Sequence, residues 1–245
     1  MELFYTLPEN VTGQSIQLDT FESKHLVTTL RKKAGDTVYV TDGCGTLFTT
    51  ILQTVHPSAR LEITHKKQHP APDPRIGLGI GYIRPNRLDF ILEKGTELGV
   101  NDFYLIRSEN ANYMSTNKNR FEKIVRQALK QSLKMYKPNV YFSGSLSEYI
   151  KQTVEYELRF AATGPEAPAV LPSFKSAYAN QQSILVTIGP EGGFSKRETE
   201  LLENDAFLCV SLGDTRLRSE TAALTAVAAV QLFTDYLKET SIGTG

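Results

Sequence analysis

The chain has 245 residues, with 27 Lys and Arg balanced by 27 Asp and Glu, and 40% of its residues are hydrophobic. This composition is typical of a soluble globular protein and excludes disordered, collagen-like and coiled-coil chains. No apolar run reaches the roughly 18 residues that a membrane span needs, and the N-terminus lacks the basic-then-apolar order of a signal peptide. We therefore expect a cytosolic, cytoplasmic protein with no membrane partner.

The first seventy residues predict a small, mostly β domain. Its expected elements are strands over 36–40, 47–55 and 61–64 and one helix over 22–33. A proline-rich stretch at 69–74 follows, and it can continue neither a strand nor a helix. We place a domain boundary there, which gives domains at 1–70 and 74–245.

After this boundary, β-rich runs alternate with helical patterns, which predicts an α/β domain with a mainly parallel sheet. The expected strands cover 76–83, 103–107, 140–142, 158–163, 184–188 and 207–212. The expected helices cover 87–98, 146–154, a segment that begins at Ser195, and 220–237. Between the strands at 158–163 and 184–188 we expect only a loop rich in Pro and Ala.

The strongest local signal lies at 184–198, where an apolar strand runs into a glycine-rich turn. Ser195 and Glu198 have the spacing of a capping box, so the next helix is expected to start there. Glycines let a flat ligand approach the backbone at the carboxyl end of a strand, where open α/β sheets bind ligands. Residues 189–192 do not fit the dinucleotide fingerprint G-x-G-x-x-G. The turn is a candidate binding loop, with plain turn geometry as the alternative.

A second glycine loop follows at 212–219 and carries Arg216 and Arg218. Both arginines are expected at the carboxyl edge of the sheet, where a guanidinium can stabilise negative charge on a substrate. Glu220 lies in the first turn of the next helix, and its simpler role is to complement the helix dipole. That helix is so small and apolar over 222–230 that it must be enclosed or lie at an interface.

A third signal is a basic stripe between residues 118 and 137. From Lys123 onward, cations recur at helical spacing at Arg126, Lys130, Lys134 and Lys137. Their mutual repulsion is costly unless a polyanion or an acidic partner relieves it, and a phosphate backbone is one such partner. A solvated lysine-rich helix is the alternative. The region 71–137 holds 12 basic and 7 acidic groups, although the whole chain is neutral.

A metal centre is not expected. The four histidines lack the H-E-x-x-H spacing that puts two ligands on one helical face. Only two cysteines are present, Cys44 and Cys209, and they form no C-x-x-C pair. The sequence therefore indicates neither a zinc site nor a disulfide framework.

Together, the two glycine loops resemble the C-terminal signature of the RsmE family of ribosomal RNA methyltransferases in the SPOUT superfamily. The matching residues are 188–195, 212–213 and 216–222. Further segments fit the family in the same order, so the resemblance covers nearly the whole chain; they include His25-Leu26, Gly35-Asp36, Asp42-Gly43 and Glu93-Lys94-Gly95. One position departs: after Gln131-Ser132 the family usually has a glycine and an arginine, where this chain has Leu133 and Lys134.

The resemblance implies a small N-terminal PUA-like β-barrel and then a SPOUT α/β domain with a C-terminal trefoil knot, at about 184–237. It implies S-adenosyl-L-methionine as cofactor and a homodimer whose knotted regions meet. The implied reaction is methylation of N3 of one uridine in 16S rRNA of the small ribosomal subunit. The residues implied to bind the cofactor are Thr163, Gly164, Ile188, Gly189, Pro190, Glu191, Gly192, Leu212, Gly213, Leu217 and Arg218.

This reaction needs alignment, and stabilisation of an N3 that has lost its proton. Arg218 and then Arg216 are the candidates for stabilising the anionic uracil or its phosphate. Glu220 is a candidate general base, and proton loss to bulk solvent is the alternative. The residues expected to hold RNA through phosphate contacts are Arg31, Lys94, Lys123, Arg126, Lys130 and Lys134.

Other functions stay open at this point. The chain could be an RNA-binding or assembly factor that keeps the fold, or a methyltransferase that acts on another RNA. A doubly wound nucleotide-dependent oxidoreductase is disfavoured, because the glycine loop lies near the C-terminus and not in the first βαβ unit.

Overall fold

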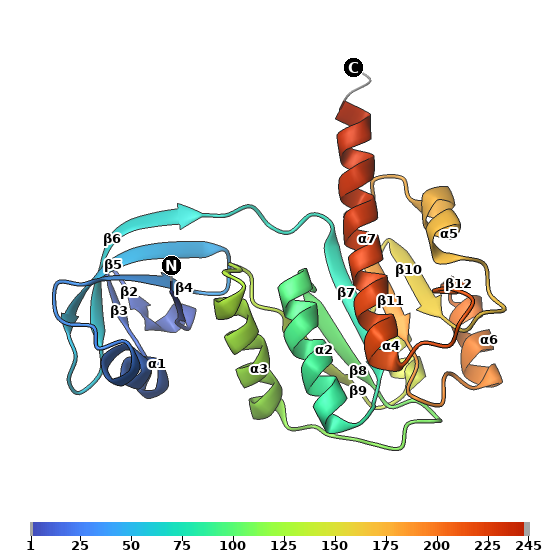
Figure 1. The fold of residues 1–245 in the computed structure, drawn as a ribbon, viewed down its shortest axis with the longest axis horizontal. Helices are drawn as coiled ribbons and strands as arrows, with labels where there is room; N and C mark the ends of the chain where they lie inside the picture. Colours follow the sequence, from blue (N-terminus) through green and yellow to red (C-terminus); the bar gives the residue numbers. More distant parts are fainter. Residues whose placement is uncertain (1, 243–245) are drawn as a thin grey trace. The chain divides into compact units, whose positions relative to one another are not determined.

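The computed structural model describes residues 2–242, and side chains over 2–238. The chain forms two compact units (Figure 1). The first comprises Met1–Pro72 and Arg126–Lys137, and the second comprises Asp73–Val125 and Pro138–Gly245. The break after Pro72 falls in the proline-rich stretch, whereas 126–137, expected in the second domain, groups with the first unit.

The first unit is built on one six-stranded sheet with the order β1-β4-β5-β6-β3-β2. Its strands are β1 (Leu3–Tyr5), β2 (Val11–Thr12), β3 (Ser15–Gln17), β4 (Thr37–Thr41), β5 (Thr46–Thr54) and β6 (Arg60–Gln68). Only β1 and β4 pair in parallel among these strands. Among the described strands, β1 and β2 each have a neighbour on one side only, so these pairings leave the sheet open.

Besides its strands, the first unit contains a short 3-10 helix, η1 (Pro8–Asn10), between β1 and β2. Two shorter helices of different types replace the single helix expected over 22–33. The backbone forms α1 (Thr20–Lys24) and then a π-helix, η2 (His25–Thr29). Asp19 starts α1 by accepting a hydrogen bond from the Glu22 amide at 2.7 Å. The chain then turns out of helix at Arg31, whose φ is 55°.

Segment 126–137 joins the first unit through backbone hydrogen bonds and charge. The Gly45 amide donates to the carbonyl of Met135 at 2.9 Å, and the Lys137 amide donates to the carbonyl of Gly43 at 2.8 Å. The helix that leads into this segment, α3 (Lys118–Gln131), ends before the predicted stripe does. Leu133 follows it with a φ of 55°, so Lys134 lies beyond the helix and the stripe is interrupted.

The second unit contains a parallel sheet with the order β12-β10-β11-β7-β8-β9. Its strands are β7 (Arg75–Gly81), β8 (Asp102–Ile106), β9 (Asn139–Ser143), β10 (Leu158–Ala162), β11 (Ser183–Ile188) and β12 (Leu208–Val210). After β9 the chain crosses to the other side of β7, where β11 pairs with it. The strand order therefore reverses beside β7, and ligands bind at the carboxyl ends of strands near such a point.

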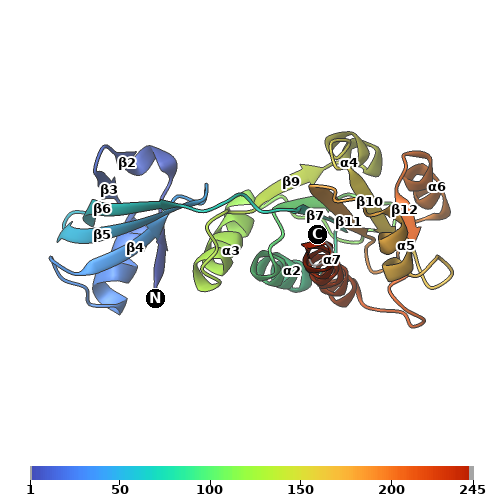
Figure 2. The ribbon, with the colours of Figure 1, turned by 90° about the horizontal axis from the view of Figure 1, so that it is seen from above.

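Helices cover both faces of this sheet (Figure 2). The helices of the second unit, besides the first part of α3, are α2 (Pro85–Leu98), α4 (Leu146–Gln152), α5 (Val170–Ala177), α6 (Lys196–Asn204) and α7 (Ser219–Ile242). One core joins α2, α5, α7 and the first part of α3 to the sheet, and α4 and α6 pack on the opposite face. Helix α5 was not expected from the sequence, because Pro172 and its small neighbours are typical of a loop; proline is nevertheless tolerated in the first turn of a helix.

The last helix packs its small residues inward. Ala223, Ala226 and Val227 are at most 1% exposed, and α7 lies against α2 and the sheet. Further along α7, Leu232 is 71% exposed. Within the part of the chain that is described, no helix combines the length and apolar character needed to cross a membrane.

Candidate functional site

A cavity of about 680 Å³ lies at the carboxyl ends of the central strands of the second unit. Three connections supply most of its wall: 162–165 after β10, 188–194 after β11 and 211–219 after β12. The start of α2 closes the remaining side with Arg84 and Arg87. This volume falls in the range of small-molecule sites, which is roughly 300–1,000 Å³.

The structure brings the residues expected to bind a cofactor to this one cavity. The lining includes Thr163, Gly164, Ile188, Gly189, Pro190, Glu191, Gly192, Leu212, Gly213, Leu217 and Arg218, together with Arg216. Sequence reasoning missed Arg84 and Arg87. They lie about a hundred residues before the glycine loops, and their only local signal was their place after a buried strand.

The first glycine loop is closely packed at Gly189 and has a left-handed backbone at Gly193. A Cβ at Gly189 would lie 3.0 Å from the amide nitrogen of Phe194 and 3.1 Å from the carbonyl carbon of Gly193. The Gly193 amide donates to the carbonyl of Pro190 at 2.8 Å, and Gly193 has a φ of 72°. These contacts explain the glycines: they allow a tight turn and leave backbone groups bare toward the cavity.

The predicted capping box is present, and its glutamate does more than start α6. Ser195 accepts from the Glu198 amide, and the Glu198 carboxylate accepts from the Ser195 amide at 2.9 Å. The same carboxylate, 2% exposed, accepts from the Ser108 hydroxyl at 3.1 Å and the Glu109 amide at 2.9 Å. Asn110 donates to the carbonyl of Gly193 at 3.1 Å. Residues 108–110 therefore brace the glycine loop from outside.

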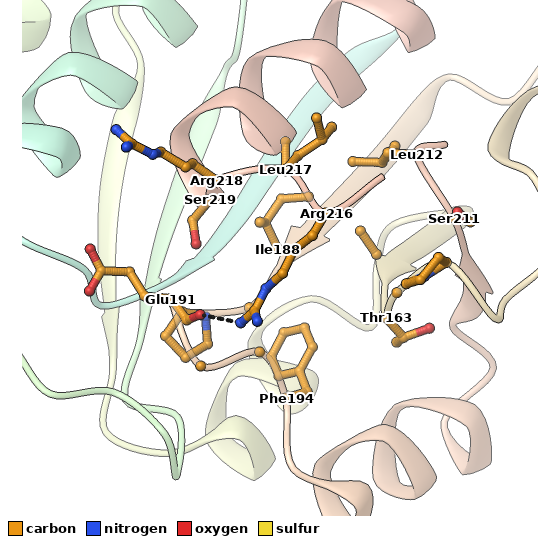
Figure 3. A pocket seen from close by; sticks show the side chains of 18 of the residues that line it. Thr163, Ile188, Glu191, Phe194, Ser211, Leu212, Arg216, Leu217, Arg218 and Ser219 are labelled. Atoms are coloured by element: carbon orange, nitrogen blue, oxygen red, sulfur yellow. Dashed lines mark hydrogen bonds between the residues drawn. The ribbon is translucent and has the colours of Figure 1, made fainter. Parts of the chain in front are cut away.

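The second loop sends its two arginines in different directions (Figure 3). Arg216 reaches across to the first loop and donates a hydrogen bond to the carbonyl of Glu191 at 3.1 Å. The Arg218 side chain points away from Arg216, and within residues 2–238 no carboxylate forms an ion pair with it. Arg218 thus presents an unpaired positive charge at the cavity.

Ion pairs link the start of α2 to the first glycine loop and to the first turn of α7. The Arg87 Nη1 atom lies 2.7 Å from Glu191 Oε1, and its Nε atom lies 3.5 Å from Glu220 Oε1. Arg84 is more exposed and lies 3.8 Å from Glu191. Glu220 is not among the described residues that line the cavity; it faces Arg87 instead. This placement favours a structural role for Glu220 over that of a general base.

Two titratable side chains near the strand ends stay protonated at neutral pH. Burial raises the pKa of Tyr82, just after β7, to about 12. Burial also raises the pKa of the Cys209 thiol on β12. Neither group can therefore accept a proton as a base under ordinary conditions.

The residues expected to hold RNA differ in their surroundings. Within the first unit, Arg126 pairs with Asp19 at 3.4 Å, and Lys130 pairs with the buried Glu22 at 2.6 Å. Burial raises the pKa of Glu22, and the Lys130 ammonium opposes that rise. An acidic partner within the chain therefore relieves part of the stripe's repulsion.

The remaining residues of that set differ in exposure and in ion pairing. Lys94, on α2, pairs with Glu93 and Glu97 on its own helix, each at 2.8 Å. Arg31 and Lys123 are exposed and Lys134 is half-buried. Among the described residues, no group of three or more His, Cys, Asp or Glu side chains is placed to hold a metal ion.

Known proteins resemble this chain over most of its length. Residues 69–231 match the family described as an RNA methyltransferase domain. The chain is 28% identical to the ribosomal RNA small subunit methyltransferase E of Rickettsia conorii, over 93% of each chain.

Solved structures agree with this match. A probable rRNA-methyltransferase from Porphyromonas gingivalis is 31% identical, with a TM-score of 0.84 over 95% of this chain and 98% of that one. A ribosomal RNA small subunit methyltransferase E from Neisseria gonorrhoeae, bound to S-adenosyl methionine, is 29% identical, with a TM-score of 0.83 over the same shares. The chain therefore belongs to the RNA methyltransferase family that includes the RsmE enzymes.

Proposed function

We propose that the protein transfers a methyl group from S-adenosyl-L-methionine to N3 of a uridine in 16S rRNA of the small ribosomal subunit. One observation carries the proposal: two glycine loops of a parallel sheet, separate in the sequence, line one cavity with an unpaired arginine. The relatives named as small-subunit methyltransferases, and the S-adenosyl methionine in the Neisseria structure, support the choice of substrate and cofactor.

The volume and the lining of the cavity are suited to such a cofactor. Ile188, Leu212 and Leu217 give it apolar walls suited to a flat nucleobase, and bare backbone at 189–193 offers hydrogen-bonding groups. Thr163 and Gly164, where φ is 132°, supply the third side. These residues would hold the cofactor, which supplies a methyl group already activated by its positive sulfur.

The protein's own part in the reaction is alignment and charge stabilisation. A uracil without its N3 proton carries negative charge, and a guanidinium at the cavity stabilises that charge. We assign this role to Arg218, since no carboxylate within residues 2–238 neutralises it. Arg216 acts differently, because its hydrogen bond to Glu191 closes the second loop onto the first.

Loss of the N3 proton to solvent fits the site better than transfer to Glu220. The Glu220 carboxylate faces Arg87, and a base must come within hydrogen-bond reach of the proton it removes. Arg218 lies on the exposed side of the cavity, where solvent could reach a bound uracil.

The finer features of fold and assembly are part of the same proposal. The first unit would act as a PUA-like β-barrel and hold RNA phosphates through Arg31 and Lys134, and Lys123 of the second unit would add a further phosphate contact. Residues 184–237 would form the trefoil knot, and the exposed apolar part of α7 would meet a second copy of the chain. Two large side chains exposed on the same part of α7, Leu232 and Tyr236, support that interface.

Methyl transfer is tested with labelled S-adenosyl-L-methionine and small ribosomal subunits that lack the modification. Mass mapping of the modified RNA should place one added methyl group on N3 of a uridine. Cofactor binding without any transfer to this RNA would favour a methyltransferase for another RNA. RNA binding without cofactor binding would favour an assembly factor.

A further inference from the structure

One guanidinium in the cavity wall contacts both the first glycine loop and the first turn of α7, which follows the second loop. Arg87 lies in the first turn of α2, and it contacts the carboxylates of Glu191 at 2.7 Å and Glu220 at 3.5 Å. Glu191 belongs to the first glycine loop, and Glu220 follows the second loop at the start of α7. The side chains of all three residues are at most 28% exposed, so solvent screens these ion pairs less than it would on the open surface.

Glu191 is fixed at two points. Arg87 holds its carboxylate, and Arg216 donates to its carbonyl oxygen at 3.1 Å. A shift of the Glu191 side chain therefore changes the position of the carbonyl that Arg216 uses. Through this residue, Arg87 acts on the contact that joins the two loops.

The positive charge of Arg87 balances the negative charge of the Glu220 carboxylate. Its Oε2 atom is buried and has no hydrogen-bond partner within the described residues, while Oε1 faces Arg87. A partly buried carboxylate that loses its cation is strongly unfavourable. Without Arg87, the first turn of α7 would shift toward water, and Arg218, two residues earlier, would move with it.

We infer that Arg87 is a positioning residue for methyl transfer, which sets the separation of the two cavity loops through Glu191 and Glu220. The inference rests on the proposed function of this cavity. Arg87 lines the cavity, but Glu191 and Glu220 engage its guanidinium, so its role in the inference is to hold the cofactor loops and Arg218 in place.

The first test compares Arg87→Ala, Arg87→Lys and the control Arg159→Ala. Arg159 is also half-buried in the second unit, where it donates to the carbonyl of Asp205 at 2.6 Å, at the other end of β10 from the cavity. We expect Arg87→Ala to weaken S-adenosylhomocysteine binding in calorimetry by about 10-fold and to lower kcat at saturating cofactor by a similar factor. Arg87→Lys should recover part of both losses, and Arg159→Ala should lower only the melting temperature.

A double-mutant cycle tests the path through the carboxylate. If Arg87 acts partly through Glu191, then Glu191→Gln should weaken cofactor binding, and adding Arg87→Ala should cause a further loss smaller than that of Arg87→Ala alone, because only the contact with Glu220 remains to be lost. Fully additive losses, or normal cofactor binding and kcat in folded Arg87→Ala, would overturn the inference.

Hydrogen exchange on the free protein separates this inference from the proposed function. Arg87→Ala should speed amide exchange across both 189–194 and 212–218, with no cofactor present. Unchanged exchange in both loops contradicts the inference even if the wild-type protein binds cofactor. Failure of the wild-type protein to bind S-adenosylhomocysteine contradicts the proposed function whatever the exchange shows.

Discussion

The guanidinium of Arg216 donates a hydrogen bond to the carbonyl oxygen of Glu191, and this bond joins the two glycine loops across the cavity. Arg218, only two residues later, points away from that bond and has no ion-pair partner within residues 2–238. Two arginines of one short loop therefore have different tasks. Arg216 joins the two glycine loops, and Arg218 is available to a substrate.

Substitution should separate these tasks. We expect Arg218→Ala to lower kcat by about 100-fold while cofactor affinity stays near that of the wild-type protein, because the charge is needed as the reaction proceeds. Arg216→Ala should mainly weaken cofactor binding, because the loops lose their connection. Steady-state kinetics and calorimetry measure both effects. Normal turnover in Arg218→Ala would remove its proposed role.

A methyl group at Gly189 should disturb the cavity. In Gly189→Ala the new Cβ would lie 3.0 Å from the Phe194 nitrogen, which is backbone and can yield only if the loop moves. We expect weaker S-adenosylhomocysteine binding and a lower melting temperature. Gly144→Ala is the control, because there the nearest atom is the flexible Glu148 carboxylate. Equal cofactor affinity in both variants would show that the tight packing of the loop is not needed.

Leu133 occupies a backbone conformation that suits glycine. Its φ is 55°, and a side chain there costs roughly 1–2 kcal/mol. We expect Leu133→Gly to raise the free energy of unfolding by about 1 kcal/mol, measured in urea. Leu133→Ala removes most of the same side chain but keeps Cβ, so it should give little of this gain. If the two variants are equally stable, side-chain contacts and not the backbone decide stability at this position.

The pH dependence of stability should show the buried Glu22. Burial raises its pKa above the ordinary value of 4.5, so the folded protein binds this proton more tightly than the unfolded chain does. The contribution of Glu22 to stability therefore falls as pH rises from 4.5 through the raised native pKa. Subtracting the stability curve of Glu22→Gln from that of the wild-type protein should give this falling slope in urea titrations from about pH 4 to about pH 8. A flat difference would contradict it.

The exposed part of α7 should carry an interface between copies. Leu232 is 71% exposed, and a charge at the centre of an apolar interface is costly. We expect Leu232→Glu to shift the protein from dimer to monomer in analytical ultracentrifugation, with little change in the far-UV spectrum. Lys151→Glu, an exposed change on α4, is the control. A wild-type protein that sediments as a monomer would contradict the interface.

Local sequence signals predicted much of the second unit. Gly99 ends α2 with a φ of 94°, and the Ser195–Glu198 box starts α6, because each depends on only a few neighbouring residues. The short strands β1, β2 and β3 were not predicted, since strands of two or three residues have no readable alternation. The basic stripe was predicted as one helix to Lys137, but the conformation of Leu133 stops it.

The site also has a part that the sequence predicts and a part that it does not. Both glycine loops can be predicted from the sequence, because close backbone packing requires specific residues. Arg87 and its carboxylates could not be found from the sequence, since an ion pair between residues 87 and 191 depends on the tertiary fold. The acidic partners of Arg126 and Lys130 were missed for the same reason; Asp19 and Glu22 lie about a hundred residues earlier.

The carboxylate of Glu198 serves two neighbours at once. It completes the start of α6 and also receives the Ser108 hydroxyl and the Glu109 amide. Shortening it to aspartate would withdraw the oxygens from both sides, so a helix end and a distant connection would loosen together. Position 198 should therefore tolerate fewer substitutions than an ordinary helix cap, where a substitution removes only one hydrogen bond.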